Sequence, residues 1–129
     1  MKKMDVTCPI TASMSVVGGK WKSVILWYLK DDPKRFGVLK KLIPECSLKM
    51  FNDNLKELEK NGIVIRNVFA EVPLKVEYSL SDYGKTLLPI ILSLRQWGVL
   101  HLIKNPEIMS TNDNLQNMIK LIIEHEGIA

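Results

Sequence analysis

Residues 47–80 read S-L-K-M-F-N-D-N-L-K-E-L-E-K-N-G-I-V-I-R-N-V-F-A-E-V-P-L-K-V-E-Y-S-L, and they predict a helix followed by a β-hairpin. Ser47 is a favourable N-cap and Gly62 a favourable residue just beyond a helix end, so the helix is expected over 48–61. Its apolar positions recur at helical spacing: Leu48, Phe51, Leu55 and Leu58. The opposite side is polar and carries Lys49, Asn52, Asp53 and Lys56. One face of this helix is therefore expected in a core and the other in solvent or against a partner.

Two runs of β-branched and aromatic residues follow, at 63–69 and 76–80. They read as two strands of a hairpin joined by A-E-V-P-L-K. A hairpin that only turns tightly more often uses Asn-Gly or Asp-Gly, so this longer connection is expected to carry something at its tip. Within that tip, residues 70–76, Pro73 stiffens the loop and Lys75 offers a charge to a phosphate or a minor groove.

Upstream of this region the sequence predicts three more helices and a short extended segment. Pro9 suits the first turn of a helix that ends at the pair Gly18-Gly19. A wide apolar stripe from Lys20 predicts a central core helix, which ends before Pro33 because the residue before proline avoids the α region. Phe36 is expected in a short strand, and residues 38–43 in a short helix closed by a proline.

Downstream, Ser81 is expected to cap a long apolar helix in which Pro89 produces a kink. A polar segment follows Pro106, and a last helix begins near Asp113. The apolar stripe of that last helix contains Leu115, Met118, Ile119 and Ile122. Both C-terminal helices are too apolar for exposure on one small domain, so we expect them to bury each other across a two-fold axis.

This order of elements describes a winged helix-turn-helix. It is an α+β fold with a three-helix core, a β-hairpin wing, and additional N- and C-terminal helices that are expected to mediate dimerisation. A chain of 129 residues is long enough for one core, so a single domain over 1–129 is expected.

Charge is unevenly distributed along the chain. Residues 105–129 contain one Lys or Arg and four Asp or Glu, a net of −3, whereas residues 1–104 contain 17 and ten, a net of +7. Between residues 20 and 49, eight basic side chains stand against three acidic ones. This excess favours a polyanion partner, with a solvated basic face as the alternative. Four of these side chains are candidate phosphate contacts: Lys34, Arg35, Lys40 and Lys41.

Several other classes of protein are disfavoured. Two cysteines without a Cys or His cluster are too few for a disulfide scaffold or a structural zinc site, so neither a metal nor a cofactor is expected. No apolar run approaches the roughly 20 residues that span a bilayer. The N-terminus has lysines but no apolar region typical of a secretion signal, which predicts a cytoplasmic protein without a membrane partner.

Several short motifs occur in the order found in a known family. They are C-P-I at 8–10, G-G-K-W-K at 18–22, I-L-W-Y-L at 25–29, K-R-F-G-V-L at 34–39, L-I-P at 42–44, L-K-E-L-E-K-N-G-I-V at 55–64 and E-V-P-L-K-V-E-Y-S-L-S-D-Y-G at 71–84. Together they resemble the HxlR-type winged helix-turn-helix transcriptional regulators. The resemblance covers residues 8–98 and leaves 105–129 as a C-terminal helical extension.

The resemblance implies a homodimer that binds double-stranded promoter DNA at a pseudo-palindromic operator. The helix 47–61 would lie in the major groove and the wing on its flank. It also implies dimerisation through the first and the C-terminal helices, and sensing of oxidants or electrophiles through Cys8. The family often has Pro-Pro-Arg at the wing tip, where this chain has Pro73-Leu74-Lys75, so insertion of a planar guanidinium is not expected here.

The expected recognition helix contains residue types that read DNA. Asn52 suits an adenine edge, Lys49 and Lys56 suit a guanine or a phosphate, and Asp53 either accepts from a cytosine or repels phosphates. Ser47, at the start of the helix, is a further candidate DNA contact. The alternative is an ordinary amphipathic helix with a solvated face.

The two cysteines have different expected roles. Cys8 precedes Pro9 at a helix start, where free N–H groups favour a thiolate, and Lys2 and Lys3 nearby would lower its pKa further. The alternative is an inert cap residue. Cys46 is expected to be a packing residue, with a second reactive thiol as the alternative.

Two other functions compete with DNA binding. An enzyme is disfavoured, because the histidines, His101 and His125, have no catalytic partner at a suggestive spacing and no Gly-rich phosphate loop is present. A winged helix used only for protein–protein contact would keep the apolar pattern and lose the basic residues of the candidate DNA-binding set.

Overall fold

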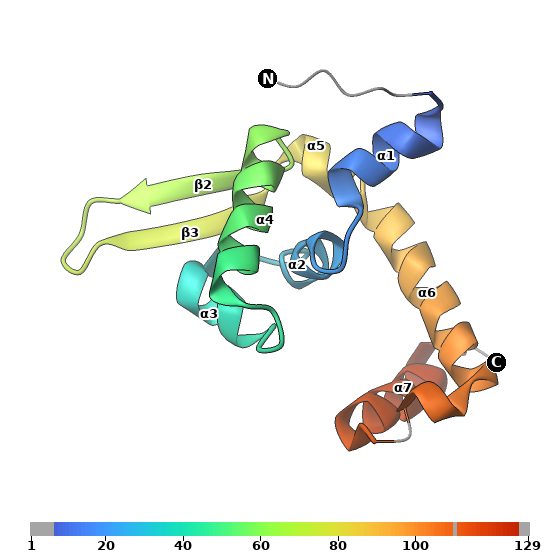
Figure 1. The fold of residues 1–129 in the computed structure, drawn as a ribbon. Helices are drawn as coiled ribbons and strands as arrows, with labels where there is room; N and C mark the ends of the chain where they lie inside the picture. The colour runs from blue at the N-terminus through green and yellow to red at the C-terminus, as the bar shows by residue number, and fades with distance from the viewer. Residues whose placement is uncertain (1–6, 110, 127–129) are drawn as a thin grey trace. The chain divides into compact units, whose positions relative to one another are not determined.

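The computed structural model describes residues 7–109 and 111–126, and Figure 1 shows the path of the chain. The chain divides into two compact units, Met1–Leu88 and Pro89–Ala129. The first unit contains the helix-turn-helix and the hairpin, and the second contains the last two long helices. The expectation of a single domain over 1–129 stays a prediction.

The first unit begins with helices whose ends follow from proline and glycine. Helix α1, Pro9–Val17, has its proline in the first turn. Gly19, two residues after the end of α1, has a φ of +87°, a left-handed conformation that glycine adopts without strain. Helix α2, Lys22–Tyr28, follows and buries Ile25 and Leu26 completely, as expected for the central core helix.

The helix after α2 begins and ends two residues earlier than predicted. Strand β1 is Lys34–Arg35, and Phe36 is the first residue of α3, Phe36–Lys41, instead of part of a strand. The aromatic ring explains this placement, because Phe36 packs edge-to-face on Phe51 of the next helix with ring centroids 5.1 Å apart. The packing of the ring therefore favours a helical backbone at Phe36 over the extended backbone that was predicted.

Helix α4, Leu48–Lys60, is the expected recognition helix. The Ser47 hydroxyl accepts a hydrogen bond from the Met50 N–H at 3.2 Å, and the helix ends before Gly62, whose φ is +73°. Phe51, Leu55 and Leu58 are buried as predicted. Leu48 is 60% exposed, which corrects its assignment to the core, because it lies in the first turn, where α4 begins at the surface.

The sheet has three antiparallel strands in the order β1-β3-β2. Strands β2, Val64–Phe69, and β3, Lys75–Leu80, form the predicted hairpin, which projects beyond α4 in Figure 1. Tyr78 of β3 pairs with Arg66 on one side and with Lys34 on the other. These three side chains therefore leave the sheet on the same face.

The core of this unit joins all the helices before the hairpin. Its completely buried side chains include Ile25, Leu26, Leu39, Phe51 and Leu58. Lys22 is the one charged residue that is buried among those described, and it forms an ion pair with Glu57 of α4. This pair links α2 directly to α4.

The long helix expected after Ser81 is interrupted. Helix α5 is Asp82–Lys85, and α6 is Leu88–Lys104. Pro89 explains the break, because its ring clashes with the carbonyl four residues earlier, at Lys85, and it has no N–H to donate. Taken as one stretch, 82–104 has 23 residues and is long and apolar enough, by length and composition alone, to cross a membrane, which corrects the expectation that no such run exists. A core or interface helix of a soluble protein meets the same criteria.

The second unit has its own small core. The short 3-10 helix η1, Pro106–Met109, was not predicted, and α7, Asp113–Glu126, begins where expected. A cluster joins α6, η1 and α7: Val99, Leu102, Met109, Leu115, Ile119 and Ile122. Arg95 donates to both carboxylate oxygens of Glu126 at 2.7 and 2.9 Å. Most of the α7 stripe is therefore covered within the chain, whereas Met118, 49% exposed, lies outside the cluster. Dimerisation through this helix stays a prediction.

Candidate nucleic-acid interface

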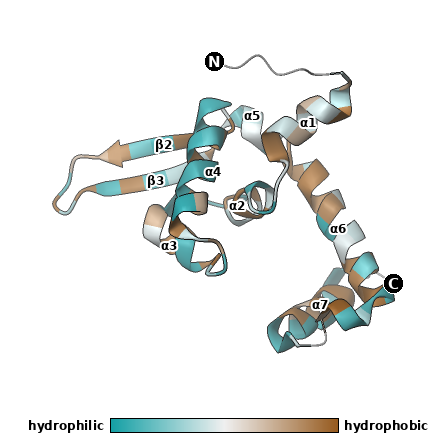
Figure 2. Ribbon diagram, viewed as in Figure 1, coloured by the Kyte–Doolittle hydropathy of each residue, from teal (hydrophilic) through white to brown (hydrophobic). Residues whose placement is uncertain are grey.

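The outer side of α4 is polar, and Figure 2 shows it in teal between the apolar positions that face the core. Lys49 and Asp53, one turn apart, form an ion pair of 3.3 Å. Asn52 lies between them and is half-buried, and Lys56 is exposed one turn further along. This part of the helix therefore presents the Asn52 amide and the Lys56 ammonium, which is unpaired among the described residues, beside a pair whose charges cancel.

The predicted phosphate contacts differ in whether their charged groups already have a partner in the chain. Lys34 pairs with Asp32, and the Lys40 ammonium donates to the Ile43 carbonyl at 3.3 Å. Arg35 and Lys41 are exposed, and neither has a hydrogen bond or ion pair within the described residues. Ser47 uses its hydroxyl as the N-cap of α4. Arg35 and Lys41 are thus the predicted cations best placed to meet a polyanion.

The wing tip differs from the prediction. Lys75 is the first residue of β3, not part of the loop, and it pairs across the strands with Phe69. Its ammonium lies 3.1 Å from the Glu77 carboxylate and 4.8 Å from the centroid of the Phe69 ring. The charge is held along the strand by these two contacts, so the tip presents the exposed apolar side chains of Val72 and Leu74 instead of a cation.

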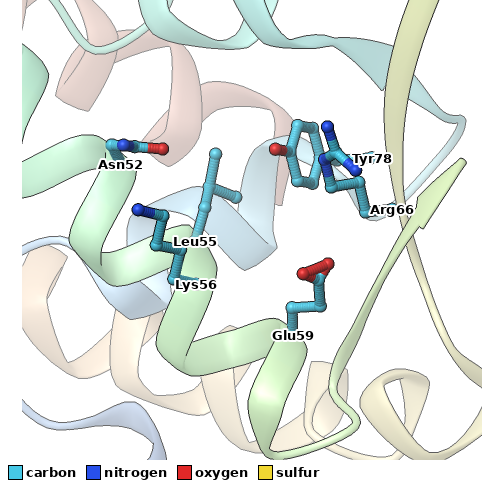
Figure 3. A pocket seen from close by; sticks show the side chains of 6 residues that line it. All are labelled: Asn52, Leu55, Lys56, Glu59, Arg66 and Tyr78. Atoms are coloured by element: carbon cyan, nitrogen blue, oxygen red, sulfur yellow. The ribbon is translucent and has the colours of Figure 1, made fainter. Parts of the chain in front are cut away.

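A groove of about 290 Å³ lies between α4 and the hairpin. Figure 3 shows the six side chains that line it: Asn52, Leu55, Lys56, Glu59, Arg66 and Tyr78. Arg66 and Glu59 were not predicted as site residues. A signal for Arg66 was present in the sequence, because it stands between Val64 and Val68 at a position of β2 where strand alternation predicts an apolar side chain.

Cys8 is the N-cap residue of α1 and is exposed. Its sulfur lies 3.3 Å from the Thr11 hydroxyl oxygen. This hydrogen bond lowers the pKa of the Cys8 thiol below its usual value, and the backbone N–H groups of Thr11 and Ile10 act in the same direction. Lys2 and Lys3, which were expected to contribute, lie outside the described residues.

Cys46 is buried, with 1% of its surface exposed, as expected for a packing residue. An intrachain disulfide with the exposed Cys8 would require Cys46 to leave the core. The two thiols therefore differ in access to solvent, and Cys8 is the one that a reagent in solution meets first.

Comparison with known proteins gives a consistent result. The family model for HxlR-like helix-turn-helix proteins matches residues 16–106. A relative from Bacillus subtilis (strain 168), the uncharacterized HTH-type transcriptional regulator YdeP, is 44% identical over 91 residues, which is 70% of this chain and 71% of YdeP.

Solved structures agree with this match. The redox regulator HypR in its oxidized form has a TM-score of 0.69 and 43% identity, with 70% of this chain and 94% of HypR covered. The reduced form of the transcriptional regulator YodB from B. subtilis has a TM-score of 0.63 and 39% identity, with 71% and 91% covered. These relatives are transcriptional regulators, not enzymes, and they share the winged helix-turn-helix fold. The chain belongs to the HxlR-like helix-turn-helix family.

Proposed function

We propose that this chain is a transcriptional regulator that binds promoter DNA as a homodimer in the cytoplasm. The observation that carries the proposal is the exposed polar side of α4 next to the β2–β3 hairpin. In a helix-turn-helix protein the second helix enters the major groove and its polar side chains meet the base edges. The hairpin then lies along the flank of the same site.

Each candidate contact has a role that follows from its surroundings. Asn52 reads a base, because its amide has both a donor and acceptors and is not committed within the described residues. Arg35 and Lys41 contact phosphates, while Lys34, Lys40 and Lys75 reach DNA only by leaving the partners described above. The N-cap residue of α4 and two residues of the helix complete the proposed set: Ser47, Lys49 and Asp53, with Lys56 considered below.

A homodimer is supported by apolar side chains that the two units expose. On α6, Ile90, Leu94 and Trp97 recur at helical spacing and are each half or more exposed. On α1, Ile10 and Met14 are likewise exposed. Exposed stripes of this kind mark interaction surfaces. Two copies related by a two-fold axis would address an inverted site with half-sites about one helical turn apart.

Sensing of oxidants or electrophiles through Cys8 is part of the same proposal. The lowered thiol pKa and full exposure of Cys8 support it. The similar regulator YodB has been solved in diamide-treated and quinone-bound forms, with TM-scores of 0.62 and 0.60 to this chain. Cys8→Ser should leave DNA binding by the reduced protein intact and abolish its response to diamide. A wild-type protein whose binding is the same before and after diamide would contradict this part.

Genomic footprinting with the purified protein tests the main proposal and identifies the operator. The expected result is a small set of protected palindromic sites. Asn52→Ala should then cost about 1–3 kcal/mol on that operator and little on random DNA. An equal loss on both would show that α4 is not the reading helix. The absence of any protected site, together with capture of a protein partner, would favour the protein-interaction alternative.

A further inference from the structure

The groove between α4 and the hairpin has cationic groups on opposite walls. Both residues line the groove, Lys56 from α4 and Arg66 from β2, and Figure 3 shows Arg66 beside the Tyr78 ring on the hairpin side. The strand register agrees with that placement, because Arg66 pairs with Tyr78, whose ring lies 6.2 Å from that of Phe36 in the core. Arg66 therefore leaves the sheet on the face covered by helices.

Both cations are uncommitted. Within residues 7–109 and 111–126, neither Lys56 nor Arg66 has a hydrogen bond or an ion pair. By contrast, Lys34, Lys49 and Lys75 each have a carboxylate partner. Both side chains are exposed, so their charged groups are open to an anion from outside the chain. A ligand that supplies such an anion would meet two cations that have no competing partner in the described part of the chain.

The position of the groove identifies that anion. A protein with one helix in the major groove and a hairpin in the adjacent minor groove straddles the sugar–phosphate strand that separates them. The space between α4 and β2 is the part of the surface that faces this strand. Arginine matches a phosphate with a planar fork of donors, and lysine adds a second point charge.

We propose that this groove seats a DNA backbone phosphate between Arg66 and Lys56, and that Glu59 weakens the site by its charge. The inference rests on the proposed DNA binding. Glu59 lines the same groove and forms no ion pair with either cation within the described residues. Its carboxylate therefore repels a phosphate that enters, which limits affinity without affecting the choice of base.

The test measures binding of fluorescent operator and random duplexes at several salt concentrations. Arg66→Gln should weaken binding to both duplexes roughly tenfold or more, and should reduce the salt slope by about one, because one phosphate contact is lost. Glu59→Gln should tighten binding to both duplexes and leave their ratio unchanged. Lys60→Gln is the matched control, because Lys60 is exposed on α4 outside the groove and its removal deletes one positive charge.

The outcomes separate the two proposals. If the wild-type protein binds neither duplex, DNA binding itself fails. If it binds and Arg66→Gln has the affinity and salt slope of the Lys60→Gln control, only the phosphate groove is overturned. Thermal unfolding of each variant checks that the fold is intact, and Arg66→Lys should recover part of the lost affinity. A thermal shift with inorganic phosphate at constant ionic strength, abolished by Arg66→Gln without a change in DNA binding, would assign the groove to a small anion and also overturn the inference.

Discussion

Cys8 shows how the start of a helix changes the chemistry of a side chain. The first N–H groups of α1 have no partner in the helix, and the Thr11 hydroxyl adds a donor 3.3 Å from the sulfur. These donors stabilise the thiolate more than the thiol, and this difference is the cause of the lowered pKa.

The first prediction follows from the sign of that shift. A lowered pKa raises the thiolate fraction at neutral pH, and Thr11→Val removes the largest contribution. In the variant, the midpoint of the pH profile for Cys8 alkylation by iodoacetamide should therefore move to higher pH, and the rate at pH 7 should fall. Mass spectrometry measures the rate of Cys8 alkylation in the wild-type protein and in the variant at each pH. Cys46 serves as the internal control, because it is buried and should react slowly in both proteins. Identical midpoints would show that Thr11 does not set the reactivity.

At this scale the sequence predicts which residues are charged but not which are paired. Lys49 and Asp53 are one helical turn apart, a spacing at which an ion pair is expected. The contacts of Lys75 with Phe69 and Glu77 instead require the strand and its register. For Arg66 the alternation of the strand between Val64 and Val68 was a local signal, and the pairing with Tyr78 adds which face of the sheet the side chain leaves. The Lys49–Asp53 pair is exposed, and pairs of that kind contribute about 0–1 kcal/mol, so DNA can compete for Lys49.

At the scale of the elements, the ends of α4 are determined by two residues. Ser47 caps the N-terminus and Gly62 permits the left-handed turn after the C-terminus. The second prediction is that Ser47→Ala lowers the free energy of unfolding by about 1 kcal/mol, measured by urea denaturation. Ser47→Asn keeps a capping oxygen and should restore most of that stability. If the two variants are equally stable, the hydroxyl does not act as a cap, and its part in DNA binding becomes the main role to test.

The third prediction concerns Gly84 in α5. A Cβ at this position would lie 2.1 Å from the Ile63 carbonyl oxygen, which also accepts hydrogen bonds from Ser81. Gly84→Ala should therefore separate α5 from the start of the hairpin and cost about 1–3 kcal/mol in unfolding free energy. Gly37 of α3 is the control, because a Cβ there meets nothing within 4 Å. Gly37→Ala should be neutral or stabilising by up to about 1 kcal/mol, and an equal loss in both variants would refute the close contact.

The helices and the hairpin could be predicted because caps, glycines and prolines mark their ends locally. Of the two differences, one has a cause outside the local pattern and the other a local cause whose position was shifted. Phe36 begins a helix because its ring packs on Phe51, which lies 15 positions later in the chain. The break between α5 and α6 precedes Pro89 by a few residues, since the clash of a proline falls on the carbonyl four positions earlier.

At the scale of the whole molecule, the exposed apolar side chains of α1 and α6 favour a second copy that covers them. The fourth prediction is that the wild-type protein sediments as a dimer at micromolar concentration in analytical ultracentrifugation. Trp97→Glu places a charge on the α6 stripe, at a side chain that is 64% exposed, and should shift the protein to monomer without unfolding it. Lys104→Glu, a charge change at the end of the same helix, is the control. A monomeric wild-type protein would contradict the proposal of a homodimer.

The arrangement of the C-terminal helices could not be predicted from their apolar pattern. A stripe such as Leu115, Ile119 and Ile122 is equally suited to a partner chain or to its own chain. The choice depends on η1, which turns the chain and adds Met109 to the cluster, and on the ion pair of Arg95 with Glu126. Both are tertiary features without a local signal.

The charges of α4 have a consequence for how the protein finds its operator. Three basic residues, Lys49, Lys56 and Lys60, are balanced by three acidic ones, Asp53, Glu57 and Glu59, so the helix has no net charge. Non-specific association with a genome depends almost entirely on phosphate neutralisation, and a neutral helix adds little to it. Retention on unrelated stretches would therefore rest on cations outside this helix, such as Arg35 and Lys41. The helix in the groove would add to the lifetime of the complex mainly where its side chains match the bases, so slow departure from the operator is where α4 would make its difference.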